Sequence, residues 1–357
     1  MAKVRDSNIE LYRIFLMVVL IMPCHYIMSS GAIGLVDSSH LTFNMYLAEF
    51  FSRTGRMGNN CFLLITGYFM CRHNFTWLKF SKIFLQVTFY AVTIYLLFVL
   101  FSRAEFSIRS LYAYLFSIPK GIGSDFIGSF TAVYLLSPFL NKLIDALDPR
   151  GLRNLIITLV AIFSVCYTMT GSPKFDMVGW YITVYLTGAY LRICPPHFLN
   201  TRKNVNLFLI LNLLIVFGSI LGITFLSQYK PGVLSFAQIS IEQSNYIMSY
   251  SCAIAFFLFF KNIKMPNSTI INTIATATLG VLCIHEHSRE MHHFLYRDLF
   301  NVKEHFTSGW FPLYMAGCVI LTYLTCVAID LIRQRFLERP LFNAIEKIIK
   351  KRNNTTL

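Results

Sequence analysis

Long apolar runs alternate with short polar stretches along nearly the whole chain. A helix needs about 20 consecutive apolar residues to cross a bilayer, and ten runs approach or exceed that length. They lie at roughly 10–30, 57–71, 79–102, 126–146, 152–170, 178–194, 205–227, 245–261, 269–287 and 310–334. The pattern predicts an all-α, polytopic membrane bundle of about ten transmembrane helices, with a membrane domain over residues 1–340 and a basic cytoplasmic tail over 341–357.

The polar connections refine this map. The amphipathic stretch 38–56 predicts an interfacial segment before the second span, and 103–125, 228–244 and 288–309 are expected to be the longest loops. With ten spans, Lys and Arg are about twice as frequent on the side that holds the N-terminus. Because positive charge is enriched in cytoplasmic loops, we expect both termini to be cytoplasmic.

Composition supports a membrane protein. The chain is 55% apolar and 13% charged, whereas soluble domains carry roughly 25% charged residues. The net charge of +14 is explained by the positive-inside rule, because nucleic-acid binding would require a contiguous basic domain. The expected partner is therefore the lipid bilayer and not nucleic acid. The nine cysteines form no CxxC motif, so neither a zinc cluster nor a disulfide framework is predicted.

The first apolar run, NIELYRIFLMVVLIMPCHYIMSSG, carries two ionisable residues, Arg13 and His25. Ionisable groups inside a membrane are costly and mark functional sites by default. A straight helix would separate the two by about 18 Å. Imidazole is a natural general base near neutral pH, and guanidinium is a natural phosphate ligand. The alternative is that Arg13 extends to the interface and His25 caps a helix end.

The second run begins with RTGRMGNNCFLLITGYFM, in which small and amide side chains permit close helix packing. Arg56 and Asn60 are candidates for substrate binding at the outer mouth of the bundle, and packing is the alternative role. Glu49, in the preceding segment, is expected to pair with Arg53 or Arg56.

The ninth run ends in LGVLCIHEHSREMHHFLYRD. His285 and Arg289 are candidates for an outer polar rim that faces a substrate, and a plain interfacial cluster is the alternative. The HExxH zinc motif is absent because position 289 is Arg, so no metal site is predicted. Further along the chain, Asp330 is expected to form a local ion pair with Arg333.

Several blocks together resemble the membrane-bound acyltransferase family 3. They are NIELYRIF…CHY, GRMGNNCFLLITGYFM, TAVYLLSPFLN, VYLTGAYLR and LGVLCIHEH, in this order, and they cover about residues 8–335. The resemblance implies a multi-pass protein of the bacterial inner membrane that O-acylates envelope polysaccharides or lipid-linked glycan precursors. It implies acyl-CoA, usually acetyl-CoA, as co-substrate with no bound cofactor. It also implies that His25 is catalytic and that Arg13 acts at the donor.

One departure from the family concerns the spacing of this pair. The family usually has ten residues between the Arg and the His, whereas this chain has eleven, Ile14 to Cys24. One extra residue rotates a regular helix by about 100°. We therefore predict a one-residue π-bulge near Val19 to Pro23, which would return both side chains to one face.

The resemblance thus implies an integral-membrane O-acyltransferase, with an O-acetyltransferase as the first expectation. Two alternatives stay open. The first is a glycan or small-molecule transporter or flippase without covalent chemistry, although no internal repeat typical of many transporters is found. The second is a family member with a structural or regulatory role.

Overall fold

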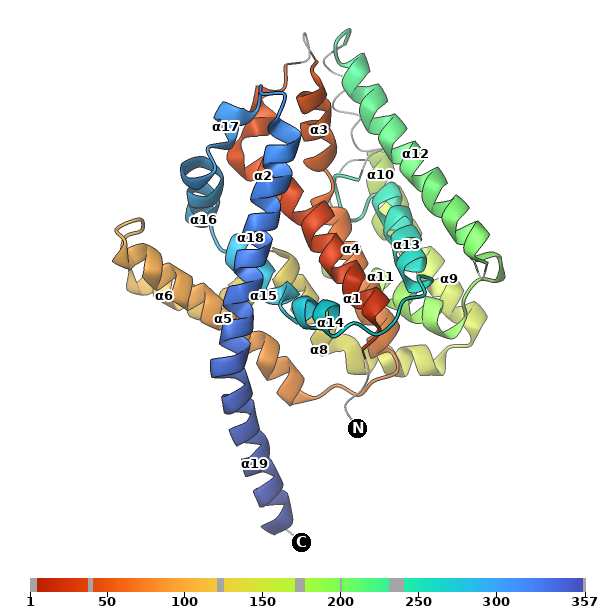
Figure 1. The fold of residues 1–357 in the computed structure, drawn as a ribbon. Coiled ribbons are helices and arrows are strands. Elements are labelled where there is room, and N and C mark those ends of the chain that lie inside the picture. Colours follow the sequence, from red (N-terminus) through yellow and green to blue (C-terminus); the bar gives the residue numbers. More distant parts are fainter. Residues whose placement is uncertain are drawn as a thin grey trace.

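The computed structural model describes residues 5–37, 41–120, 125–170, 177–199, 201–230 and 241–355. Within these ranges the fold is helical and contains no strand, which confirms the predicted all-α class (Figure 1). Six helices are long and apolar enough to cross a membrane, and a bent pair provides a possible seventh crossing. The six cover Ser7–Ser30, Trp77–Leu100, Phe126–Ala146, Pro149–Thr170, Arg202–Leu226 and Phe311–Ile348.

Three of the other predicted spans form shorter helices in the bundle. They are α4 (Gly55–Met70), α11 (Met177–Ile193) and α13 (Ile247–Lys261), with 16, 17 and 15 residues. Most residues of all three are buried. These lengths fall below the roughly 20 residues of a full crossing. The ten-span count and the cytoplasmic placement of both termini therefore stay predictions.

The first span is interrupted by a π-helix. Helix α1 (Ser7–Phe15) continues into the π segment η1 (Leu16–Ile21) and then into α2 (Met22–Ser30), with Pro23 in the first turn of α2. Because a π turn accommodates an extra residue, this segment confirms the predicted bulge. It begins three residues earlier than expected, at Leu16 instead of Val19.

Helices α4 and α11 cross at a pair of glycines. A Cβ on Gly67 would lie 2.1 Å from the Tyr185 carbonyl oxygen, and a Cβ on Gly188 would lie 2.5 Å from that of Leu64. Any larger residue would force the backbones apart, so these positions require glycine for close approach. The packing role considered for the glycines of the second run is therefore observed at Gly67.

The ninth run is bent and continues as helix. Helices α14 (Thr269–Thr276) and α15 (Thr278–His285) lead into α16 (Arg289–His293) and the π segment η6 (Phe294–Leu299), with a bend of 94° between the two parts. The Ser288 side chain caps α16 by accepting a hydrogen bond from the Met291 amide, as N-cap residues commonly do.

The prediction of long loops is wrong for two of the three stretches, because they contain short helices. The stretch 288–309 forms α16, η6 and α17 (Val302–His305), and 103–125 contains α6 (Ile108–Leu115) and α7 (Ser117–Lys120). Helix α6 is amphipathic and α16 is capped by Ser288, so polar residues that resemble those of a loop belong here to helices. Within 228–244, residues 231–240 lie outside the described ranges. The predicted interfacial segment contains α3 (Phe43–Phe51).

The other helices frame this core. Their bounds are α5 Trp77–Leu100, α8 Asp125–Ala146, α9 Pro149–Val160, η3 Ala161–Val165, α10 Cys166–Thr170 and α12 Arg202–Leu226. The last helix, α18 (Phe311–Arg333), continues through η7 (Gln334–Glu338) into α19 (Arg339–Thr355), which projects away from the bundle (Figure 1). The predicted domain boundary at residue 340 falls inside this helix. The expected ion pair of Asp330 with Arg333 is confirmed at 2.8 Å.

Candidate active site

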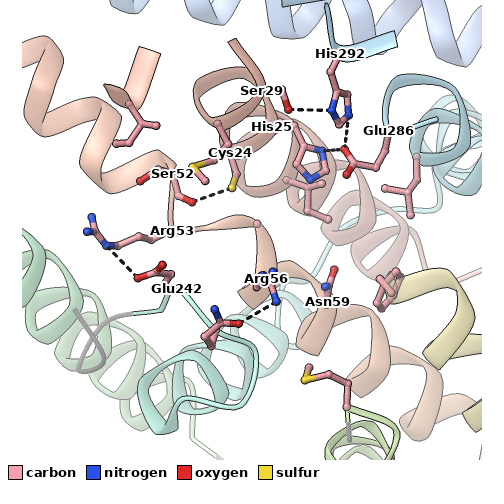
Figure 2. A pocket seen from close by; sticks show the side chains of 18 of the residues that line it. Cys24, His25, Ser29, Ser52, Arg53, Arg56, Asn59, Glu242, Glu286 and His292 are labelled. Atoms are coloured by element: carbon pink, nitrogen blue, oxygen red, sulfur yellow. Dashed lines mark hydrogen bonds and ion pairs between the residues drawn. The ribbon is translucent and has the colours of Figure 1, made fainter. Parts of the chain in front are cut away.

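A polar cavity of about 750 Å³ opens among α2, α4, α11, the segment after α3, and the bend between α15 and α16. His25 lines it from α2, and Glu286 and His292 line it from the two sides of the bend (Figure 2). The bend matters because it turns two residues six positions apart toward the same space. The cavity therefore joins the first-helix histidine to the cluster at the end of the ninth run.

His25 is held by two groups at one ring nitrogen. Its Nδ1 lies 2.8 Å from a carboxylate oxygen of Glu286 and 3.0 Å from Nε2 of His285. The other nitrogen, Nε2, has no hydrogen-bond partner among the residues of the described ranges. His25 thus has one occupied nitrogen and one available nitrogen.

The surrounding acceptors assign the tautomers. Nδ1 of His285 lies 2.6 Å from the Val281 carbonyl, which can only accept, so this nitrogen carries the proton and Nε2 of the neutral ring accepts. His25 must then donate from Nδ1 to both His285 and Glu286. In its neutral form His25 consequently presents an unprotonated Nε2, the state that a general base requires.

A second histidine completes the network. The carboxylate oxygen of Glu286 that contacts His25 also lies 3.0 Å from Nε2 of His292, and Nδ1 of His292 lies 3.2 Å from the Ser29 hydroxyl. His292 donates to Glu286 and accepts from Ser29 in the arrangement that satisfies every partner. Glu286 is thereby fixed from two sides, as Figure 2 shows.

The cavity also contains three guanidinium groups in different surroundings. Arg53 forms the predicted ion pair with Glu49 and lies 4.0 Å from Glu242. Arg56 donates to the neutral Gln243 at 2.9 Å. Arg289 lines the cavity without an ion pair or hydrogen bond to any residue of the described ranges. Arg56 and Arg289 therefore leave positive charge available to a ligand.

The other predicted site residues lie elsewhere. Arg13 does not line the cavity, and its guanidinium lies 3.4 Å from the Glu10 carboxylate near the opposite end of the helix. Asn60 is fully buried and holds α4 to its neighbours: it donates to the Ser244 carbonyl at 2.6 Å and accepts from the Trp180 indole at 3.0 Å. The preceding residue, Asn59, lines the cavity instead. His285 is also fully buried and lies behind His25.

The sequence-based candidates omitted two members of the network, Glu286 and His292. The signal for them was present in the dense IHEHSREMHH segment and in Ser29, one helical turn after His25. Without the bend and the contact across 260 positions, however, nothing singled out one acidic residue of that segment as the partner of His25.

The same side chains have the chemistry of metal ligands. Three potential ligand atoms lie within 4.8 Å of one another, one each from His25, His285 and Glu286. Every short contact among them is also accounted for by a hydrogen bond, as assigned above. The expectation that the site uses no metal stays a prediction.

Comparison with protein-family models identifies the chain. A model described as an acyltransferase domain matches residues 6–330. The chain belongs to acyltransferase family 3. Comparisons with curated proteins and with solved structures gave no match. The family assignment and the apolar helices together describe a multi-pass membrane acyltransferase. In this acyltransferase the matched region includes the first helix, the cavity and the bend after α15.

Proposed function

We propose that this protein is an O-acyltransferase that moves an acyl group, with acetyl as the expected group, from acyl-CoA to a hydroxyl of an envelope polysaccharide or a glycan precursor. The single observation that carries the proposal is the contact of His25 with Glu286, which leaves Nε2 of His25 available in the cavity. The family assignment supports acyl transfer, and no observation supports the transporter alternative. The bacterial inner membrane is the proposed location.

The proposed reaction needs one base and no bound cofactor. Nε2 of His25 accepts the proton of the acceptor hydroxyl while the hydroxyl oxygen attacks the thioester carbonyl carbon. The C–S bond breaks, and the leaving thiolate takes the proton back from the imidazolium, which yields the ester and free CoA. Glu286 holds the ring through Nδ1 and stabilises the imidazolium that forms. The aspartate carboxylate has the same role in Ser-His-Asp triads.

A second route uses the same nitrogen as a nucleophile. Attack by Nε2 on the thioester would give a transient acyl-imidazole that the acceptor hydroxyl then cleaves. The available Nε2 suits both routes. Acylated protein trapped without acceptor would favour the second route.

Substrate-binding roles follow from charge and position. Arg56 and Arg289, whose guanidinium groups have no carboxylate partner in the described part of the chain, bind anionic groups of donor or acceptor at the cavity. Asn60 and His285 act from behind, by holding α4 and His25. Arg13 acts on the donor near the other end of the helix, as the family resemblance implies.

The test is release of free thiol from acetyl-CoA by purified protein in nanodiscs, with native envelope glycan as acceptor. Wild type is compared with His25→Ala and with His293→Ala, a matched control whose half-exposed side chain pairs with Asp298. We expect release and glycan acetylation that His25→Ala abolishes and His293→Ala retains. Folded wild type that consumes no acetyl-CoA with the glycan present would contradict the proposal.

A further inference from the structure

The cluster of His25, His285 and Glu286 has nearly the dimensions of a metal site. Nδ1 of His25 lies 3.0 Å from Nε2 of His285 and 2.8 Å from a carboxylate oxygen of Glu286. In a tetrahedral zinc site with bonds of about 2.0–2.2 Å, neighbouring ligand atoms are about 3.3–3.5 Å apart. Side-chain shifts of about half an ångström would therefore open the cluster enough to hold an ion.

His285 already has the tautomer that a metal ligand needs. Its Nδ1 donates to the Val281 carbonyl at 2.6 Å, one turn earlier on α15, and the lone pair of Nε2 is left on the side of His25. Metal-bound histidines almost always donate their other N–H to a carbonyl or carboxylate, because this bond fixes the tautomer and the ring orientation. His285 is thus oriented as a ligand by the helix that carries it.

Glu286 is oriented by an outer hydrogen bond as well. The oxygen that contacts His25 also lies 3.0 Å from Nε2 of His292, and carboxylates that ligate metals are commonly held in this way. The resulting ligand set, two imidazoles and one carboxylate, is the set that several zinc enzymes use. Mg²⁺ and Ca²⁺ prefer oxygen ligands alone. The donors therefore select zinc or a similar transition-metal ion.

The polar cavity provides access for the ion and a fourth ligand. His25 and Glu286 both line the cavity, with side chains that are 21% and 19% exposed (Figure 2). His285 is fully buried, but the ion replaces the proton that lies between its Nε2 and Nδ1 of His25, so His285 needs no exposure of its own. With three protein ligands, the fourth position remains for a water molecule from the cavity.

An ion at Nδ1 of His25 would remove the base at the other side of the same ring. In the network without an ion, Nδ1 carries the proton and Nε2 has the available lone pair. Coordination uses the lone pair of Nδ1, so the single proton of the neutral ring moves to Nε2, and no proton is gained or lost. Nε2 can then neither accept the proton of a hydroxyl nor attack a thioester.

We propose that His25, His285 and Glu286 form an inhibitory site for Zn²⁺ or a similar transition-metal ion, whose binding stops acyl transfer by holding the proton of His25 on Nε2. The ion takes no part in the reaction itself. The inhibitory effect rests on the proposed function, whereas the binding of the ion does not.

The first test measures ion binding with no acyl-CoA or glycan present. Untagged full-length protein in nanodiscs is titrated with Zn²⁺ by calorimetry, and with Co²⁺, whose visible absorption reports the coordination geometry. We expect one tightly bound ion per chain and the spectrum of four-coordinate Co²⁺. The absence of a tightly bound ion would overturn the proposal, and so would the spectrum of six-coordinate Co²⁺.

Two variants and a control locate the ion. His285→Phe removes one ligand, and Glu286→Gln replaces another with a neutral amide. Each should weaken Zn²⁺ binding by at least about tenfold, since even outer hydrogen-bond partners change metal affinity by roughly 10- to 100-fold. His293→Ala removes a half-exposed histidine that pairs with Asp298 and should bind Zn²⁺ as wild type does. Equal affinity of wild type and folded Glu286→Gln would assign the ion to an adventitious surface site and overturn the proposal.

The second test measures inhibition. Transfer of labelled acetyl to the glycan is followed instead of thiol release, because thiolates themselves bind metals. We expect half-maximal inhibition at the Zn²⁺ concentration that half-saturates the site, recovery with a chelator, and no inhibition by Mg²⁺ at the same concentration. Full activity with the site saturated would overturn the inhibitory role. An inactive wild type would contradict the proposed function, while the binding test still decides whether the metal site exists.

Discussion

The two ends of the first helix illustrate how differently two membrane-embedded ionisable residues can be held. Arg13 contacts Glu10, three positions away on the same helix. His25 is held by residues about 260 positions away, which a bend brings to its ring. A local partner offsets the cost of burying a charge, whereas a distant and fully satisfied network fixes ring orientation and tautomer. We therefore propose that the chemical step takes place at the His25 end.

The largest effect is expected at that end. His25→Gln keeps a polar side chain but removes the base, so kcat for acetyl transfer should fall by about 10³-fold, within the range of general-base removal. The KM for acetyl-CoA should change little, because His25 acts on the acceptor proton. Steady-state kinetics in nanodiscs measure both constants. A kcat within tenfold of wild type would remove the assigned role.

Glu286→Gln should have the next largest effect. The amide preserves the shape but loses the charge that stabilises the imidazolium, and its NH₂ group can oppose the Nδ1–H of His25. We expect kcat to fall by about 10²-fold. Glu304→Gln, at an exposed position of α17 that lines neither the polar cavity nor the smaller cavity beside it, is the control and should stay near wild type.

A smaller and different effect is expected at the Arg13 end. Arg13→Gln should raise the KM for acetyl-CoA by about tenfold, the loss of one charge-assisted contact, and should leave kcat within a few-fold of wild type. Inhibition by desulfo-CoA, which measures donor binding alone, should weaken equally. A fall in kcat without a change in KM would place Arg13 in the chemical step instead.

The smallest effect is expected when the π segment is removed. Deleting Val19, a half-exposed residue of η1, should convert the π turn to a regular helix and keep both ends in register, with activity within about threefold. Deleting Leu214 from the regular helix α12 would rotate one half by about 100° against the other. We expect that control to lose thermal stability. Equal loss in both deletions would show that η1 does not absorb an extra residue.

Local features of this chain could be predicted from sequence, and distant ones could not. Apolar runs along the chain predicted the helices. The spacing of Arg13 and His25, compared with the spacing usual in the resembled family, predicted the π segment. The contact of His25 with Glu286 depends on the 94° bend. The polar sequence at this bend resembles that of a loop, so the bend could not be predicted from the sequence. The choice of Asn59 over Asn60 for the cavity depends on the rotation of α4, since adjacent residues on a helix face different directions.

A double-mutant cycle measures whether Glu286 acts through His25. The kcat for acetyl transfer would be measured for wild type, His25→Gln, Glu286→Gln and the double variant in nanodiscs. If Glu286 serves only to orient and stabilise the His25 ring, its loss costs nothing further once the ring is gone. We therefore predict that the double variant is as slow as His25→Gln alone. A double variant slower by the full product of the two single effects would show that Glu286 acts independently of His25.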